Sequence, residues 1–464
     1  MAGGTWEAQN KLQPGIYINF KSSPKLLATI GDRGIVAIAR EMDWGATDEL
    51  IMINSLEDVY PKLGYDITSD KLRFIREILL GTTLSAGASK IMVYRLPTTD
   101  GAAASATISK VTATAKYLGV RGNDITVVIT PNPDTEVTEG IYAVFTVSTI
   151  VDGVIQDSQV VGSFTSISEN TPAKVADLKN NAWVNFTGQA NDLVSPTSGA
   201  PLTGGLNGTI AATAYSSFLT ALEPMSFNVV IYDGSDAVTK SAFASFVKRL
   251  SYNTGKYCQA VLAKYKEADN ETVISVKNGY ELNDGATLTP EQATWWVGGA
   301  TAGARNNQSL TYGVHPNAVD AVPRLTNAEL NDSILEGSFV FFEEYGKVKV
   351  LTDINTFTSF NQDKSNSFRK NRVIRVLFAI ANDIYKTFAL YYVGKTDNNE
   401  TGRNLLKAEI VGYINQLQGN NAVQNFTADD VEVLPGNDID SVIINVNVQP
   451  VDSIEKIYMT VTVS

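Results

Sequence analysis

The chain has 464 residues, 44% of them hydrophobic and 19% charged, which is an ordinary globular balance and enough for roughly two to four domains. Its formal net charge of −12 argues against nucleic-acid binding, because neutralising phosphates requires a basic surface. A single cysteine, Cys258, excludes an internal disulfide. We expect a soluble chain without membrane insertion, since no signal peptide opens it and no apolar stretch reaches the ~20 residues that span a bilayer.

The first segment, residues 1–30, is predicted to be an extended arm. Pro14-Gly15 precedes the short alternating run Ile16-Tyr17-Ile18-Asn19-Phe20. This run is typical of a strand, yet no partner strand lies close to it in the sequence.

Residues 31–97 and 204–344 predict one α/β core domain. Continuous apolar runs of the kind found in buried strands alternate with amphipathic helices, which indicates βαβ units and a largely parallel sheet. Ser69 is expected to cap one helix, and Thr289 followed by Pro290 to open another. The strands are expected at 35–39, 91–94, 227–232 and 259–263.

Residues 98–203 are rich in Thr, Ser, Gly and β-branched side chains and poor in helix signals. They predict a β-rich domain inserted into the core domain, with strands at 125–130, 142–151 and 154–161. Asp152-Gly153 lies between the last two and predicts a tight hairpin, because type I′ turns need positive φ at both central positions.

Residues 345–450 predict an α+β C-terminal domain. A long helix at 366–392 carries one apolar stripe, and Arg372, Arg375 and Lys386 are expected on its opposite, exposed face. A second helix follows Gly402, with Gly419 expected just beyond its end. Two strands come last, at 440–448 and at 456–463.

Residues 451–464 are expected to form a C-terminal arm. Ile457, Met459, Val461 and Val463 alternate strictly along it, and Gln449-Pro450-Val451-Asp452 is interpreted as the hinge that leads into it. The predicted fold class is therefore a multidomain α/β chain with an inserted β-rich domain, an α+β C-terminal domain and extended terminal arms.

Catalytic and cofactor motifs are absent from the sequence. The one histidine, His315, cannot form a histidine-based metal cluster, and we interpret it as structural. Neither 119–124 nor 202–208, both glycine-rich, has the spacing of a phosphate-binding or dinucleotide-binding loop. Neighbouring carboxylates such as Glu343-Glu344 and Asp429-Asp430 leave an acidic hydrolase as an alternative that spacing alone does not exclude.

The C-terminal third contains more specific motifs. Gly313-Val314-His315-Pro316, Pro323–Leu330, Thr352–Thr356 and Phe368–Arg375 resemble the contractile tail sheath proteins of myophages and of phage-derived particles such as R-type bacteriocins and defective prophages. The resemblance continues through Tyr392–Arg403 and Gln449–Val461. Weaker echoes at Pro14-Gly15, 119–124 and 203–205 extend it over nearly the whole chain.

The resemblance implies a structural subunit and no enzyme. Sheath subunits stack as hexameric rings in a helical homo-oligomer around an inner tail tube. They contract from a metastable extended state and drive the tube through a cell envelope. Baseplate and tail terminator proteins are the further partners implied, with no nucleic acid and no cofactor. The implied location is the virion tail or a phage-derived particle, assembled in the bacterial host cytoplasm.

The resemblance also implies that terminal strands join sheets of neighbouring subunits, and that the C-terminal domain faces the tube. Strand exchange is therefore expected at Ile16, Tyr17, Ile18, Phe20, Ile457, Met459, Val461 and Val463. The alternative is that both terminal strands pair within their own domain. Arg372, Arg375 and Lys386 are candidate tube contacts, and the alternative for them is an ordinary solvated helix face.

Two other classes of function stay open from the residues alone. One is a different self-assembling protein, such as a surface-layer or non-contractile tail component. The other is the acidic α/β hydrolase. If polymerisation requires the C-terminal strand, the sheath interpretation is distinguished from both of these alternatives.

Overall fold

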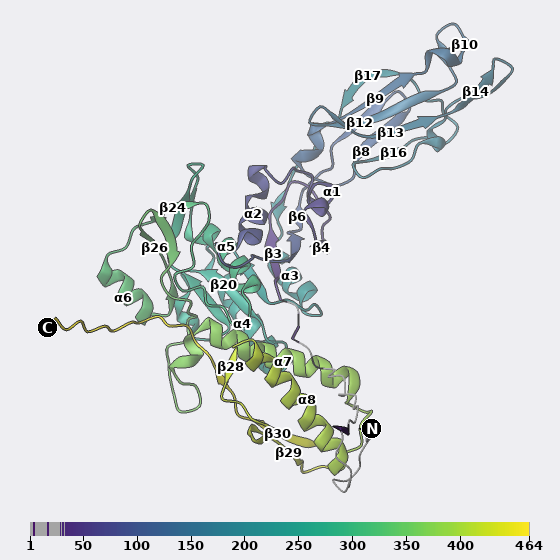
Figure 1. The fold of residues 1–464 in the computed structure, drawn as a ribbon. Helices are drawn as coiled ribbons and strands as arrows, with labels where there is room; N and C mark the ends of the chain where they lie inside the picture. Colours follow the sequence, from purple (N-terminus) through teal and green to yellow (C-terminus); the bar gives the residue numbers. More distant parts are fainter. Residues whose placement is uncertain (1–2, 5–15, 18–27, 29, 32, 464) are drawn as a thin grey trace. The chain divides into compact units, whose positions relative to one another are not determined.

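The computed structural model describes residues 3–4, 16–17, 28, 30–31 and 33–463, and Figure 1 shows its elements. The chain divides into two compact units. The larger unit runs from residue 32 to Phe378 and includes the last residues from Asp452 onwards. The smaller unit joins the N-terminal residues up to Gly31 to Ala379–Val451.

The larger unit is built on a seven-stranded sheet with the order β25-β21-β20-β19-β3-β5-β4. All neighbours in it are parallel except β4, which runs antiparallel to β5. Its strands are β3 Ile35–Arg40, β4 Leu50–Ile53, β5 Lys90–Arg95, β19 Val229–Tyr232, β20 Gln259–Ala263, β21 Val273–Val276 and β25 Ser338–Phe339.

Both faces of this sheet are covered by helices, which is why its strands are mostly apolar. In β3, Val36 and Ile38 lie in one buried cluster with residues of α2 and α5. Ala37 and Ala39 lie in a second cluster with residues of α3 and α4. These helices are α2 Arg73–Leu80, α3 Ala214–Leu222, α4 Ala237–Asn253 and α5 Pro290–Gly303; the short α1 spans Val59–Leu63.

Two predicted helix starts agree with the structure, although one differs in detail. Thr289 accepts the N–H of Gln292, and Pro290 is the first residue of α5. Ser69 accepts the N–H of Lys71, but the turn that it caps is a short 3₁₀ segment ahead of α2.

The inserted region is a β-sandwich. One sheet has the order β13-β12-β9-β17 and the other β16-β8-β7, and their inward side chains share one core. The turn between β12 and β13 is the predicted hairpin, because Asp152 and Gly153 have φ of 51° and 77°. The strands are β7 Ser105–Ile108, β8 Val111–Ala115, β9 Ile125–Pro131, β12 Phe145–Val151, β13 Val154–Val161, β16 Val184–Thr187 and β17 Thr197–Pro201.

The insertion starts and finishes at one short ladder, in which β6 Thr98–Thr99 pairs with β18 Thr209–Ile210. Smaller hairpins extend the sandwich strands. They are formed by β10 Glu136–Thr138 with β11 Ile141–Tyr142, and by β14 Ser163–Ser166 with β15 Glu169–Thr171.

The rest of the larger unit adds short antiparallel elements beside the core. A three-stranded sheet has the order β23-β22-β24, and β26 pairs with β27 as a hairpin. The strands are β22 Gly279–Leu282, β23 Thr287–Leu288, β24 Ala318–Val322, β26 Phe341–Glu344 and β27 Lys347–Val350. One further helix, α6 Asn327–Leu335, follows β24 in the sequence.

The smaller unit contains two long helices and two strand pairs. Helix α7, Asn371–Tyr391, starts in the larger unit and ends in the smaller one, and α8 spans Glu400–Gly419. The pairs are β28 Val423–Gln424 with β31 Gln449–Pro450, and β29 Val431–Pro435 with β30 Val442–Val446.

The structure differs from the predicted domain boundary at residue 345. That position lies within the hairpin β26–β27, whose side chains Phe341, Val348 and Val350 belong to the main core. The division falls within α7 instead, between Phe378 and Ala379. Because α7 is one continuous helix, its sequence carries no sign of this division.

The expected C-terminal end of α8 is also corrected. Gly419 is the last residue of the helix itself, and the left-handed residue that follows is Asn421, with φ of 57°. Asparagine tolerates this conformation because its short side chain can bond locally. With these corrections the fold is the predicted mixed α/β chain, and its predicted β-rich insertion is a β-sandwich.

The reactivity of the Cys258 thiol tests how completely the core of the larger unit excludes solvent. Its side chain is 2% exposed, and burial raises the pKa of the thiol to about 12. Because the thiolate is the reactive form, we expect no reaction of the native protein with a thiol reagent at pH 8. One thiol per chain should react in denaturant. Rapid stoichiometric labelling of the native protein would contradict this packing.

Candidate functional site

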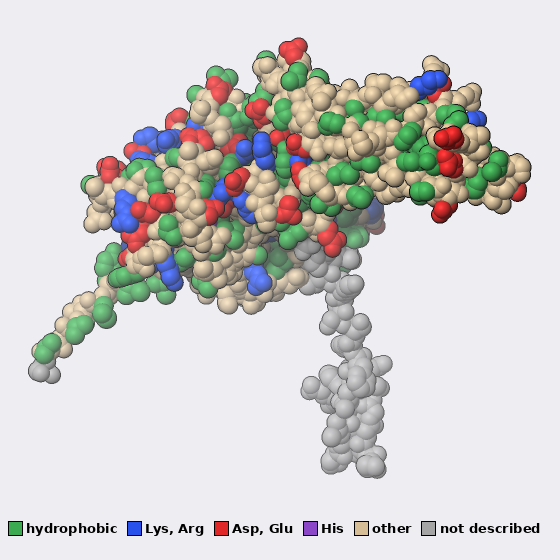
Figure 2. All heavy atoms as spheres, turned by 90° about the horizontal axis from the view of Figure 1, so that it is seen from above, with side chains coloured by type: hydrophobic (Ala, Val, Ile, Leu, Met, Phe, Trp, Pro, Cys, Tyr) green, Lys and Arg blue, Asp and Glu red, His purple; other side chains and the backbone are tan. Residues whose placement is uncertain are grey.

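The C-terminal arm leaves the larger unit as an extended segment without a strand partner in the described part of the chain. Residues 452–463 belong to no ladder. Ile457, Met459, Val461 and Val463 are 84%, 81%, 74% and 91% exposed, and Figure 2 shows the hydrophobic side chains standing along this arm. A strand pattern whose backbone groups find no partner in its own chain is a template for pairing with another chain.

The root of this arm is clasped by the larger unit through Glu455. Its carboxylate accepts a hydrogen bond from the Thr311 hydroxyl at 2.7 Å and an ion-paired hydrogen bond from Lys370. The Glu455 side chain is 15% exposed, so these charge-assisted bonds are sheltered from water and are stronger than surface pairs. The direction in which the arm leaves is therefore fixed by residues far from it in sequence.

A buried ion pair supports this clasp. The Asp353 carboxylate accepts hydrogen bonds from the Arg375 guanidinium at 2.7 Å and from the Asn371 side-chain amide at 2.9 Å. The side chains of Arg375 and Asp353 are each 1% exposed. The backbone N–H of Asp353 donates to the Thr311 hydroxyl at 2.9 Å. Thr311 thus accepts from the Asp353 backbone and donates to Glu455, which links the buried pair to the arm.

The expectation that Arg372 and Arg375 lie on an exposed helix face is wrong. Arg375 is fully buried and Arg372 is 9% exposed, because the first turns of α7 are enclosed on all sides. Burial lowers the pKa of Arg372, and the Asp452 carboxylate partly offsets this. Lys386, farther along α7, is exposed as expected. The periodicity predicts the helix, but it does not distinguish a solvated polar face from a buried polar network.

Part of the predicted hinge is paired backbone. Gln449 and Pro450 form β31 against β28 in the smaller unit, and the Val451 N–H donates to the Ala422 carbonyl at 2.9 Å. The free arm therefore begins at Asp452, where the chain passes from the smaller unit to the larger one.

The N-terminal strand has a local partner that the sequence did not reveal. Ile16 and Tyr17 form β2, which pairs in parallel over two residues with β1, Gly3–Gly4. Ile18 and Phe20 lie outside the described residues. A glycine pair carries no apolar alternation, so its sequence does not predict a strand.

The smaller unit holds the chain just after the N-terminal arm through two carboxylates of its helices. Asp383 of α7 accepts the Gly31 N–H at 2.9 Å and the Tyr413 hydroxyl at 2.7 Å. Glu409 of α8 accepts the Ala28 N–H, and Gln416 donates to the Ala28 carbonyl at 3.1 Å. Sequence analysis missed Glu409, whose signal was a carboxylate within the apolar stripe of α8.

His315 lies in a buried polar cluster. Its Nδ1 accepts the N–H groups of Asn317 and Ala318 at 3.2 and 3.0 Å, so the ring proton is on Nε2 and points to the Glu77 carboxylate, 3.0 Å away. The Tyr280 hydroxyl donates to the same carboxylate at 2.7 Å. Every polar atom of the ring is thereby engaged in joining a loop to α2.

The described residues offer no group of three His, Cys, Asp or Glu side chains arranged to hold a metal. Within the same residues, every helix is too short or too polar to cross a bilayer.

Four protein-family models match successive parts of the chain. They are described as tail sheath protein Gp18 domain III N-terminal region at residues 33–96, phage tail sheath protein beta-sandwich domain at 99–207, phage tail sheath protein central domain at 208–356 and phage tail sheath C-terminal domain at 363–464.

Individual proteins are similar over the same extent. The phage-like element PBSX protein XkdK of Bacillus subtilis strain 168 is 33% identical over 492 residues, covering 100% of both chains. The crystal structure of a sheath tail protein from Desulfitobacterium hafniense is 43% identical, with 96% of this chain and 99% of that chain covered and a TM-score of 0.81. The anti-feeding prophage helical sheath in its contracted state shares the fold at 14% identity, a TM-score of 0.55 and 97% and 98% coverage.

Arg375→Met tests the buried pair. Leaving the Asp353 carboxylate without its guanidinium partner should cost about 3–5 kcal/mol of unfolding free energy, measured by denaturant titration of the monomer. Adding Asp353→Asn should recover part of this loss, because no unpaired buried charge remains. An unchanged unfolding midpoint for Arg375→Met would show that the pair is not buried as described.

Glu455→Ala tests the clasp on the arm. Losing charge-assisted bonds worth about 1.5–3 kcal/mol should lower the unfolding free energy of the monomer by about that amount, measured by denaturant titration. Lys456→Ala is the matched control, since Lys456 is exposed and its removal should leave the unfolding free energy unchanged. Equal unfolding free energies in the two variants would argue against the clasp.

Proposed function

This chain belongs to the phage tail sheath protein family, and from that premise we propose that it polymerises as stacked hexameric rings around an inner tail tube. The assembled sheath is a component of a virion tail or of a phage-derived particle. It contracts from a metastable extended state and drives the tube through the target cell envelope. The work comes from two packings of one lattice separated by a barrier, so the subunit needs no catalytic site and no cofactor.

The observation that carries this proposal is the C-terminal arm. It combines four exposed apolar side chains in strict alternation with a backbone that has no ladder among the described residues. In an isolated subunit the apolar side chains of this arm stay exposed to water and contribute no hydrophobic stabilisation. Added to a neighbour's sheet, it satisfies its backbone groups and buries its apolar face, and the alternation sets its register.

The smaller unit offers an edge for such a strand. β29 and β30 form a two-stranded ribbon, and a ribbon of two strands is marginally stable by itself. The arm of a second subunit, through Ile457, Met459, Val461 and Val463, would extend this ribbon to three strands, about the smallest sheet that is stable by itself. Exchange through Ile16, Tyr17, Ile18 and Phe20 of the N-terminal arm belongs to the same proposal.

For the tube contact, the proposal now rests on Lys386. It is the exposed cation of the three candidates, whereas Arg375 is engaged with Asp353 and Arg372 is buried. A solvent-facing lysine supports a contact that is weak and reversible, as release of the tube during contraction requires. Baseplate and tail terminator proteins complete the proposed partners, and assembly takes place in the bacterial host cytoplasm.

Deleting residues 456–464 tests the proposal. The truncated monomer should keep its circular dichroism and unfolding midpoint, because the deleted segment adds nothing to the core, but it should no longer form hollow striated tubes in negative-stain electron micrographs. A hydrolase or another globular protein would be indifferent to the deletion.

A point variant refines the same test. Val461→Pro removes one backbone donor from the arm and should prevent tube formation, whereas the matched Val461→Ile keeps the donor and should assemble normally. Tubes from the truncated protein that are indistinguishable from the intact ones would refute strand exchange by the C-terminal arm.

A further inference from the structure

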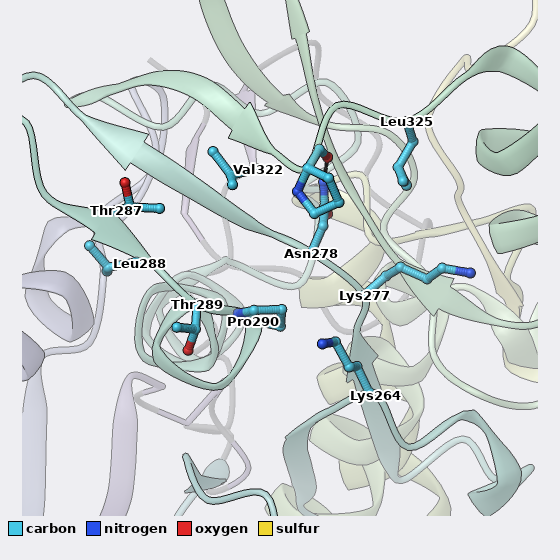
Figure 3. A pocket seen from close by; sticks show the side chains of 10 residues that line it. Lys264, Lys277, Asn278, Thr287, Leu288, Thr289, Pro290, Val322 and Leu325 are labelled. Carbon is cyan, nitrogen blue, oxygen red and sulfur yellow. Dashed lines mark hydrogen bonds between the residues drawn. The ribbon is translucent and has the colours of Figure 1, made fainter.

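An apolar pocket of about 320 Å³ lies where the parallel strands β20 and β21 end, beside the start of α5. Its apolar wall consists of Leu288, Pro290, Val322, Pro323 and Leu325. Figure 3 shows Thr287 and Leu288 on one side of the hollow and Lys264 and Lys277 on the other. The pocket is therefore an apolar hollow with ammonium groups at one side of its rim.

The two lysines differ in what they already bind. Lys277 is 3.3 Å from Glu336, a carboxylate that it shares with Lys266. Lys264 is exposed, and no described carboxylate lies within ion-pairing distance of it. The rim thus has capacity for an additional anion. A side chain that fills this pocket would be apolar and would carry a carboxylate next to it.

The chain presents such a group on the loop between β29 and β30. Ile439 is 96% exposed and lies between Asp438 and Asp440, which are exposed as well. Among the described residues neither aspartate carboxylate is within ion-pairing distance of a cation. Asn398 donates to the carbonyls of Ile439 and Ser441 at 2.8 and 2.9 Å, and the Gly436 N–H donates to the Ser441 carbonyl at 2.9 Å. The apolar tip is thus held out on an ordered loop, which lowers the entropy lost on docking.

We propose that Ile439 of one subunit inserts into the pocket lined by Leu325 and Val322 of a second copy, with Asp438 and Asp440 facing Lys264 and Lys277. The apolar wall suits an aliphatic side chain, and the charges of the rim lysines and of the two aspartates are opposite. Ile439 and the pocket belong to different surfaces of the subunit, so the contact is heterologous and propagates from copy to copy. This inference rests on the proposed self-assembly and adds a contact that is independent of the arms.

Disulfide trapping between two copies tests the contact. In a Cys258→Ala background, Ile439→Cys is made on a chain with a size tag and Leu325→Cys on an untagged chain. The two are mixed under assembly conditions with a mild oxidant. We expect the tagged–untagged dimer to form at least roughly tenfold faster than with Leu84→Cys, a control at an 88% exposed position. Val322→Cys replaces Leu325→Cys if the latter does not fold.

The outcomes separate this inference from the proposed function. Striated tubes with trapping no faster than the control would overturn the contact and leave the sheath function standing. Failure to form tubes at all from unmodified protein would count against both. Charge exchange gives an independent measurement, in which Lys264→Glu raises the protein concentration needed for assembly and Lys264→Glu with Asp440→Lys restores it. A double variant no better than Lys264→Glu would also overturn the contact.

Discussion

The buried ion pair between Arg375 and Asp353 is the interaction on which the rest of this subunit's working parts depend. Two opposite charges that are 1% exposed are tolerated only with close geometry and further hydrogen bonds. Asn371, the Leu310 N–H and the Gln308 carbonyl supply some of these bonds, while Nε and Nη1 of Arg375 are buried without a hydrogen-bond partner among the described residues. The pair therefore fixes three separate stretches of chain at one point. The start of α7 and the root of the C-terminal arm both meet there.

That arrangement explains how a chain can hold an arm out in a defined direction without folding it back. Glu455 is bonded to Thr311 and Lys370, whereas the residues beyond it are exposed. From Lys456 to Val463 every side chain is exposed. The arm is thus held at its base and exposed along its length.

Much of this fold could be predicted from local patterns. The apolar runs that became β3, β19 and β20, the Thr289 cap and the Asp152-Gly153 turn each follow from local sequence. The errors involve contacts distant in sequence. The helix pattern places Arg375 in solvent, because a polar helix face and a buried polar network share one periodicity, and Asp353, 22 residues away, gives no local signal. Glu455 and Thr311 are 144 residues apart, so no local pattern connects them.

The short ladder between β6 and β18 has a consequence for how such subunits vary. It brings together the two points where the sandwich leaves and rejoins the core, Thr98–Thr99 and Thr209–Ile210. Any module whose own ends lie as close as two hydrogen-bonded strands fits that junction without moving the central sheet. Evolution can exchange the inserted module there, and so can a designer who wishes to replace the sandwich with a foreign domain.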